Sequence, residues 1–412
     1  MNKEKMNKEK TSAIIKFVLK DKFFYITFFI AFLMYVYLLH PALAGKNFTD
    51  IKPHAGFAKL WIEKGLSHAP LNFLYFGTVI VLGGFYANLQ WLGFISAIVL
   101  SLSWAAKYSI SKWIIKDYLI IYNIDTKVFD NYINYLAIAI CFVGHIPFNT
   151  ILDRNHLNFY MGELSPNTWH NSTTTFMLPF CVLLFYLTYK KVFLNEKGLN
   201  TLITILAITC FFVKPNFTLC FSPIYFCCIF YKYKLTKNFW LALPACVIPF
   251  ILILLHSLIL FSSDYGGSYA QINQPSIIFS PFSVWQLQLG NPILAPILSF
   301  FSVSILPILY FVFYKKHSNL VYYSLAFSIL ALMIFVSFAE VNNSSIAPSG
   351  NFLWQVTMCN YIMFLVFGVE FMKRTLTESL DLKKISIWFL IALHSMSGIM
   401  YMGRILVSKY YF

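Results

Sequence analysis

The chain has 412 residues, of which 59% are hydrophobic and 11% are charged, and its formal net charge is +15. Soluble domains carry roughly 25% charged residues, so this composition excludes an ordinary soluble protein. The positive charge does not indicate nucleic acid as a partner, because the lysines stand in short clusters between apolar runs, as in the cytoplasmic loops of membrane proteins.

Long apolar runs recur from Phe23 to Met402, each close to the roughly 20 residues that cross a bilayer. Runs this long and uniform favour helices over barrel strands. The sequence therefore predicts an all-α fold, a polytopic transmembrane helical bundle that forms a single integral membrane domain over residues 1–412. No group of cysteines and histidines has the spacing of metal ligands, so we predict no metal site from the residues themselves.

The N-terminal segment 1–22 is rich in lysine, and the positive-inside rule places it in the cytoplasm. The first span is then Phe23–Leu43, and residues 44–90 form the first external loop. Within that loop, apolar side chains recur at helical spacing over Pro53–Lys64. This pattern predicts a short helix that lies on the membrane surface.

The apolar stretch Leu71–Ala106 is long enough for two spans, but two spans would reverse the side of every later lysine cluster. We therefore expect Leu71–Val81 to be a second interfacial helix that ends at Gly83-Gly84. One crossing follows over Leu89–Ala106, and Lys107–Asn131 is then cytoplasmic.

The same reasoning gives about eleven crossings of a bacterial inner membrane. Residues 149–173 and 262–292 are the further large external loops, and Lys214-Pro215-Asn216 is a tight external turn. The remaining predicted spans are Tyr132–Phe148, Thr174–Tyr189, Leu199–Val213, Phe217–Tyr231, Phe239–Phe261, Ile293–Tyr314, Leu320–Phe338, Phe352–Phe371 and Ile385–Arg404.

A polar interruption directly after the first span carries the first candidates for chemistry. Asp50 and His54 are four residues apart and share one face of a helix. Asp50 is the candidate general base that takes a proton from a sugar hydroxyl, with His54 beside it, or else it is the N-cap of a surface helix. His68 either binds a substrate phosphate, orients Asp50, or is a solvated loop histidine.

Lys214 lies between two apolar runs, on the side of the membrane where lysine is less expected. An ammonium group there suits a lipid-linked phosphate or diphosphate. The alternative is a lysine that extends along the apolar surface to the lipid head groups.

Two external loops supply the other substrate-binding candidates. In residues 149–173, Arg154 can bind a phosphate through two hydrogen bonds, and Trp169 either stacks on a sugar or joins the interfacial aromatic belt. The second loop is polar and nearly uncharged, which suits carbohydrate contact, a mobile lid or a plain connector. Together the loops offer Arg154, Glu163, Trp169, His170, Asn171, Asp264 and Tyr265.

With Asp50 in the first external loop and His68-Ala69-Pro70 ahead of the second crossing, the chain resembles the GT-C group of integral membrane glycosyltransferases. The resemblance implies a polyprenyl-linked sugar donor and a glycan or glycolipid acceptor, joined at the outer membrane face during cell-surface polysaccharide or glycolipid assembly. It implies that Asp50 is the base and that Lys214 and Arg154 neutralise the departing phosphate. The group often has two adjacent acidic residues where this chain has one, which leaves a divalent cation open.

Other functions stay open at this stage. An O-antigen or capsule repeat-unit polymerase uses similar donor chemistry but relies on arginines in large external loops, where this chain offers Arg154. A lipid-linked oligosaccharide flippase or other transporter needs a charged central cavity, whereas the predicted spans contain almost no carboxylates. A non-catalytic scaffold is the remaining alternative. The sequence contains no Walker loop, HExxH or GxSxG motif.

Overall fold

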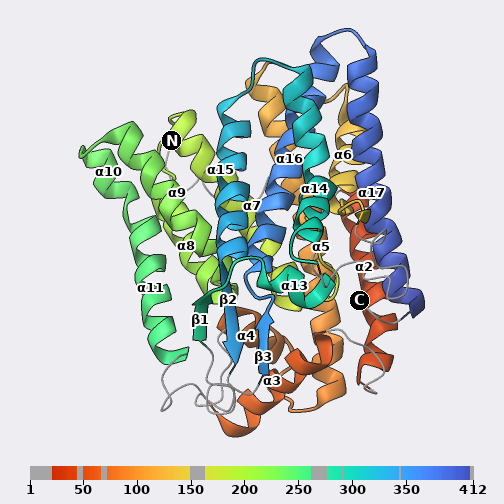
Figure 1. The fold of residues 1–412 in the computed structure, drawn as a ribbon, viewed down its shortest axis with the longest axis vertical. Helices are drawn as coiled ribbons and strands as arrows, with labels where there is room; N and C mark the ends of the chain where they lie inside the picture. The colour runs from red at the N-terminus through yellow and green to blue at the C-terminus, as the bar shows by residue number, and fades with distance from the viewer. Residues whose placement is uncertain are drawn as a thin grey trace, which may run out of the picture.

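The computed structural model describes residues 21–43, 50–65, 72–148, 163–260, 276–289, 291–342 and 345–408. Their helices form an upright bundle, with a small sheet at one end (Figure 1). The elements are α2 (Lys22–Leu43), α3 (Ile51–Lys64), α4 (Phe73–Leu82), α5 (Leu89–Ile121), α6 (Asp130–Cys141), α7 (Ser172–Phe193), α8 (Asn200–Val213), α9 (Asn216–Tyr233), α10 (Lys237–Ala242), α11 (Pro244–Leu260), β1 (Ser276–Phe279), α13 (Ser283–Leu289), α14 (Leu294–Phe313), α15 (Asn319–Ser337), β2 (Phe338–Asn342), β3 (Ser345–Ser349), α16 (Leu353–Thr377) and α17 (Leu382–Ser408).

Seven helices in the described residues are long and apolar enough to cross a membrane, namely α2, α5, α7, α14, α15, α16 and α17. The prediction of an integral membrane protein with several spans is confirmed at that level. The count of eleven crossings stays a prediction, because the other four predicted spans correspond to α6, α8, α9 and the broken pair α10–α11. α8, for example, has 14 residues, or about 21 Å of helix, against a hydrocarbon core of about 30 Å.

The two short helices expected after the first span are present as α3 and α4, at the same end of the bundle as the sheet (Figure 1). Trp61 of α3 packs edge to face against Phe73 of α4, with ring centroids 5.9 Å apart. α4 ends at Leu82 with Gly83 as its C-cap, and Gly84 follows with a φ of 66°, a conformation that glycine adopts at no steric cost. The predicted helix end at Gly83-Gly84 is therefore confirmed.

The predicted end of the second crossing at Ala106 is corrected by the structure, because α5 continues as far as Ile121. Lys107 and Lys112 are buried within this helix. The ammonium of Lys112 lies 2.5 Å from the carboxylate of Asp21, which precedes α2. A lysine that has an internal partner does not need water, so its charge does not mark the end of a helix.

A second correction concerns α6, which ends at Cys141 although a span over Tyr132–Phe148 was predicted. The backbone that follows pairs with other elements: Gly144 N–H donates to the carbonyl of His394 at 2.9 Å, and Ile146 N–H to that of Ser302 at 3.0 Å. A Cβ atom built on Gly398 would lie 1.7 Å from a carbonyl oxygen of this segment. The glycine in α17 thus permits the close approach that satisfies this non-helical backbone.

The described part of the chain also contains a small antiparallel sheet of three strands in the order β1-β2-β3. Ser276 pairs with Val341 and Phe279 with Phe338, so β1 joins the predicted loop 262–292 to the segment after α15. The prediction of an all-α fold is confirmed, and this small sheet is an addition at one end of the helical bundle. The predicted spans contain one carboxylate, Glu370, which is fully buried in α16 and pairs with Lys373 at 2.8 Å.

Candidate functional site

Asp50 stands directly before α3, at the N-cap position, but its side chain makes no capping hydrogen bond. The carboxylate instead accepts a hydrogen bond of 2.7 Å from the side-chain amide of Asn171. Its backbone N–H donates to the carbonyl of His170 at 3.1 Å. These two hydrogen bonds attach the start of α3 to the segment that precedes α7, although Asp50 and His170 are 120 residues apart in the sequence. The carboxylate of Asp50 therefore points toward the side chain of Asn171.

Asn171 is the residue that connects this carboxylate to a cation. Its side-chain oxygen caps α7 by accepting from the N–H of Thr174 at 3.0 Å. The same oxygen accepts from the ammonium of Lys214 at 2.9 Å, while the nitrogen of the amide donates to Asp50. Because an amide carries both a donor and an acceptor, one side chain can bridge two groups of opposite charge.

Lys214 lies in the short connection between α8 and α9, in extended backbone with a φ of −162°. Its ammonium also donates to the hydroxyl of Thr173 at 2.9 Å and lies 4.8 Å from the centroid of the Trp354 ring. Lys214 is buried, and in the part of the chain that the structure describes no carboxylate forms an ion pair with it. The charge of the ammonium is therefore only partly balanced, through Asn171.

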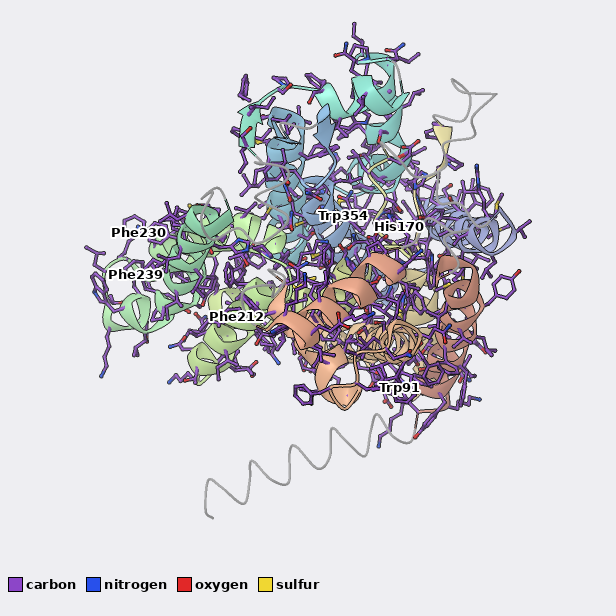
Figure 2. All side chains as sticks on the ribbon, turned by 90° about the horizontal axis from the view of Figure 1, so that it is seen from below. Trp91, His170, Phe212, Phe230, Phe239 and Trp354 are labelled. Carbon is purple, nitrogen blue, oxygen red and sulfur yellow. The ribbon has the colours of Figure 1, made fainter. Side chains whose placement is uncertain are left out.

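Two histidines lie beside this group. The ring of His170 packs 5.6 Å from that of Trp354, and its Nδ1 lies 2.9 Å from the hydroxyl of Tyr401. Figure 2, which views the bundle from this end, shows His170 and Trp354 next to each other. His54, in the first turn of α3, packs against Tyr75 and Phe76 of α4 with ring centroids 5.8 and 5.4 Å apart.

Burial sets the protonation of these groups, which lie outside the membrane-spanning helices. It raises the pKa of Asp50 to about 6, against the opposing positive charge of Lys214. It lowers the pKa of Lys214 to about 7, against the opposing charge of Asp50. Burial and the charge of Lys214 lower the pKa of both His54 and His170 to about 3. Near pH 7 the site therefore holds an ionised carboxylate, two neutral histidines and an amine close to its titration point.

Four helices begin at this site. Asp50 precedes α3, Asn171 caps α7, Lys214 and Pro215 precede α9, and Trp354 lies in the first turn of α16. A helix N-terminus carries a partial positive charge, so four of them next to a buried ammonium favour an anionic ligand. The arrangement can hold an anion and place a carboxylate base beside it.

The structure places the other described candidates elsewhere. Trp169 is buried and stacks on Trp104 with ring centroids 3.7 Å apart and planes within 7°. Glu163 is buried against α14, where it accepts from the hydroxyl of Ser302 at 3.5 Å. The structure uses the ring of Trp169 in interior packing, and the stacking of this ring on a sugar stays a prediction. His68, Arg154, Asp264 and Tyr265 lie outside the described residues.

Some residues of the site were not predicted from the sequence. Thr173 and Trp354 both contact Lys214, and Gln355 follows in the first turn of α16. The sequence did contain a signal, which is the position of these residues. Thr173, Trp354 and Gln355 are polar or aromatic residues at the start of two otherwise apolar runs.

The donors around Asp50 do not fit a resident divalent cation, since the carboxylate has an ammonium and amides for neighbours. Within the described ranges, no group of three or more histidine, cysteine, aspartate or glutamate residues is placed to hold a metal ion.

Comparisons of the chain with protein-family models, with curated proteins and with solved structures gave no match.

Proposed function

We propose that the protein is a membrane glycosyltransferase that moves a sugar from a polyprenyl-linked donor to an acceptor hydroxyl. The single observation that supports it best is the link Asp50–Asn171–Lys214, which joins a carboxylate and a buried ammonium through one amide. Such a donor carries a phosphate on an apolar chain, and the site offers a cation and helix N-termini at the end of an apolar bundle.

In the proposed reaction the acceptor oxygen attacks the anomeric carbon of the donor sugar. A new carbon–oxygen bond forms while the bond from that carbon to the phosphate oxygen breaks, and its electron pair goes to the phosphate. Asp50, ionised near neutral pH, takes the proton of the acceptor hydroxyl. Lys214 and the helix N-termini stabilise the charge on the departing phosphate, which is where such sites supply much of their rate enhancement.

His54 and His170 contribute as neutral, packed rings. His170 is uncharged, and its backbone carbonyl accepts a hydrogen bond from the N–H of Asp50. Its role is therefore to position the base. His54 lies one helical turn from Asp50 and packs against Tyr75 and Phe76, and in the proposed site these rings keep water away from the carboxylate. A drier surrounding strengthens the electrostatic interactions of the carboxylate.

The test is Asp50→Asn, which keeps the shape of the side chain and removes the base. Transfer from an undecaprenyl-phosphate sugar in proteoliposomes should fall by about 10²–10⁴-fold, the usual contribution of a general base. The matched control is Glu63→Gln in α3, where the carboxylate is 44% exposed and pairs with Lys59. Wild-type turnover in a correctly inserted Asp50→Asn protein would remove Asp50 from the mechanism.

A transporter of lipid-linked oligosaccharide is the second candidate, and the observation that favours it is Lys107. This lysine is buried in the apolar helix α5, and no carboxylate among the described residues pairs with it. Ionisable groups inside spans often mark the path of a charged substrate. Under this proposal Lys107→Met abolishes the flipping of a fluorescent polyprenyl phosphate in vesicles and Asp50→Asn does not. The polymerase alternative depends on Arg154, which the described residues do not include.

A further inference from the structure

A second group of polar side chains adjoins Lys214, and it takes no part in the reaction as proposed. The side-chain amide of Asn216 donates to the carbonyl of Asn351 at 3.0 Å and to the side-chain oxygen of Gln355 at 3.4 Å. The amide of Asn351 donates to the carboxylate of Glu340 at 2.7 Å. We refer to Asn216, Glu340, Asn351 and Gln355 as the amide cluster.

The amide cluster lies close to Lys214, the residue that binds the phosphate in the proposed function. Asn216 is two residues from Lys214, so the two Cα atoms are at most about 7 Å apart. Gln355 follows Trp354, whose ring faces both Lys214 and His170. The cluster is thus continuous with the candidate site and draws on the first turns of α9 and α16 together with β2.

Gln355 is the member that indicates a missing ligand. Its side chain is fully buried, with 0% of its surface exposed. Its nitrogen has no hydrogen-bond partner among the described residues, although its oxygen accepts from Asn216. A buried amide donor is nearly always satisfied in a folded protein, so a group from outside the chain is the natural partner.

The chemistry of the cluster selects hydroxyl groups over phosphate. Three amides offer both donors and acceptors, which is what a sugar hydroxyl requires, since it both donates and accepts. The carboxylate of Glu340 accepts from Asn351 and repels an anion. A phosphate is therefore directed to Lys214, and a neutral polyhydroxylated group to the amide cluster.

We propose that the amide cluster binds the hydroxyls of the sugar on the lipid-linked donor and so determines which sugar is transferred. This inference rests on the proposed function, because it assigns the phosphate of the same donor to Lys214. Asn216 and Gln355 are then specificity residues, and the nitrogen of Gln355 is the donor that a correct hydroxyl satisfies. A sugar that lacks that hydroxyl leaves the buried nitrogen unpaired and is rejected.

The experiment compares lipid phosphates with and without a sugar on the purified full chain in detergent. The probes are undecaprenyl phosphate alone and its glucose, galactose, mannose and N-acetylglucosamine derivatives, with Kd measured by thermophoresis for each. The wild-type protein should bind at least one glycosylated probe about tenfold more tightly than the sugar-free lipid. Gln355→Met and Asn216→Ala should remove that preference and leave the affinity for undecaprenyl phosphate unchanged.

Two further variants make the outcomes distinct. Lys214→Met should weaken all probes by a similar factor, and Gln286→Met, the same change on an exposed surface of α13, should alter none of them. If the wild-type chain prefers one sugar and Gln355→Met and Asn216→Ala keep that preference, the inference is wrong and the proposed function stands. An absence of preference among all sugars also overturns the inference. If no polyprenyl phosphate binds the wild-type chain, the proposed function itself fails.

Discussion

Replacement of Lys214 by arginine tests the site through its pH dependence. In the proposed reaction Asp50 must be ionised, which occurs above its pKa of about 6, and Lys214 must be protonated, which occurs below its pKa of about 7. The plot of kcat/KM against pH should therefore be a narrow bell, because it reports the free enzyme's essential acid and base. Arginine stays protonated throughout this range, so Lys214→Arg should keep the acidic limb and lose the alkaline limb.

The magnitude follows from the two pKa values. Near pH 6.5 about three quarters of each group is in the required state, whereas near pH 8.5 only about 3% of Lys214 is protonated. The wild-type rate near pH 8.5 should thus be about one twentieth of its maximum. The Lys214→Arg rate should stay within about twofold of its own maximum at that pH.

The assay is transfer from an undecaprenyl-phosphate sugar in proteoliposomes, measured from about pH 5 to 9. The donor is a phosphodiester, whose acidic proton is lost far below this range, so the substrate contributes no limb. Lys59→Arg, in α3 and 40% exposed, is the matched control and should retain the wild-type bell. The reasoning is refuted if the wild-type rate stays level up to pH 9, or if Lys214→Arg falls on the alkaline side as the wild-type protein does.

Two other predictions concern the fold. Lys107→Met should change the free energy of unfolding in detergent by less than about 1 kcal/mol. The two oxygens that accept from Lys107, the carbonyl of Cys141 and the side-chain oxygen of Asn167, each keep another hydrogen-bond donor. Asn167→Ala should lower the free energy of unfolding by about 1–3 kcal/mol, since it removes the 2.6 Å bond to the carbonyl of Cys141 and an acceptor of Lys107; equal effects would contradict this account. For topology, an impermeant thiol reagent on intact cells should label Lys59→Cys in α3 and spare Lys127→Cys in the turn after α5, and the reverse pattern would invert the orientation.

The structure brings together four residues that the sequence had singled out one by one. Asp50, His170, Asn171 and Lys214 were candidates because polar side chains are conspicuous between apolar runs. Their link through the amide of Asn171 was not predictable, because it joins residues 121 and 43 positions apart along the chain. Local sequence reports the composition of each loop and carries no record of which loops meet.

The neighbour of His170 in the sequence shows the same limit from the other side. Trp169 stands one residue before His170, yet its ring packs on Trp104 in the interior. Adjacent residues of one loop can thus have different environments, and the packing of the chain decides which of them enters the site. Gln355, which no motif had marked, lies at the site because the first turn of α16 meets that of α9.

The sequence by itself determined that the chain is a polytopic membrane protein, because the transfer free energy of a long apolar run depends on composition alone. It also determined the helix end at Gly83-Gly84, where glycine's conformational freedom is a local property. Only the tertiary structure decided that α6 stops at Cys141 and that Lys107 and Lys112 are buried. Those outcomes depend on partners supplied by distant helices, whose contacts replace the water that a polar group would otherwise require.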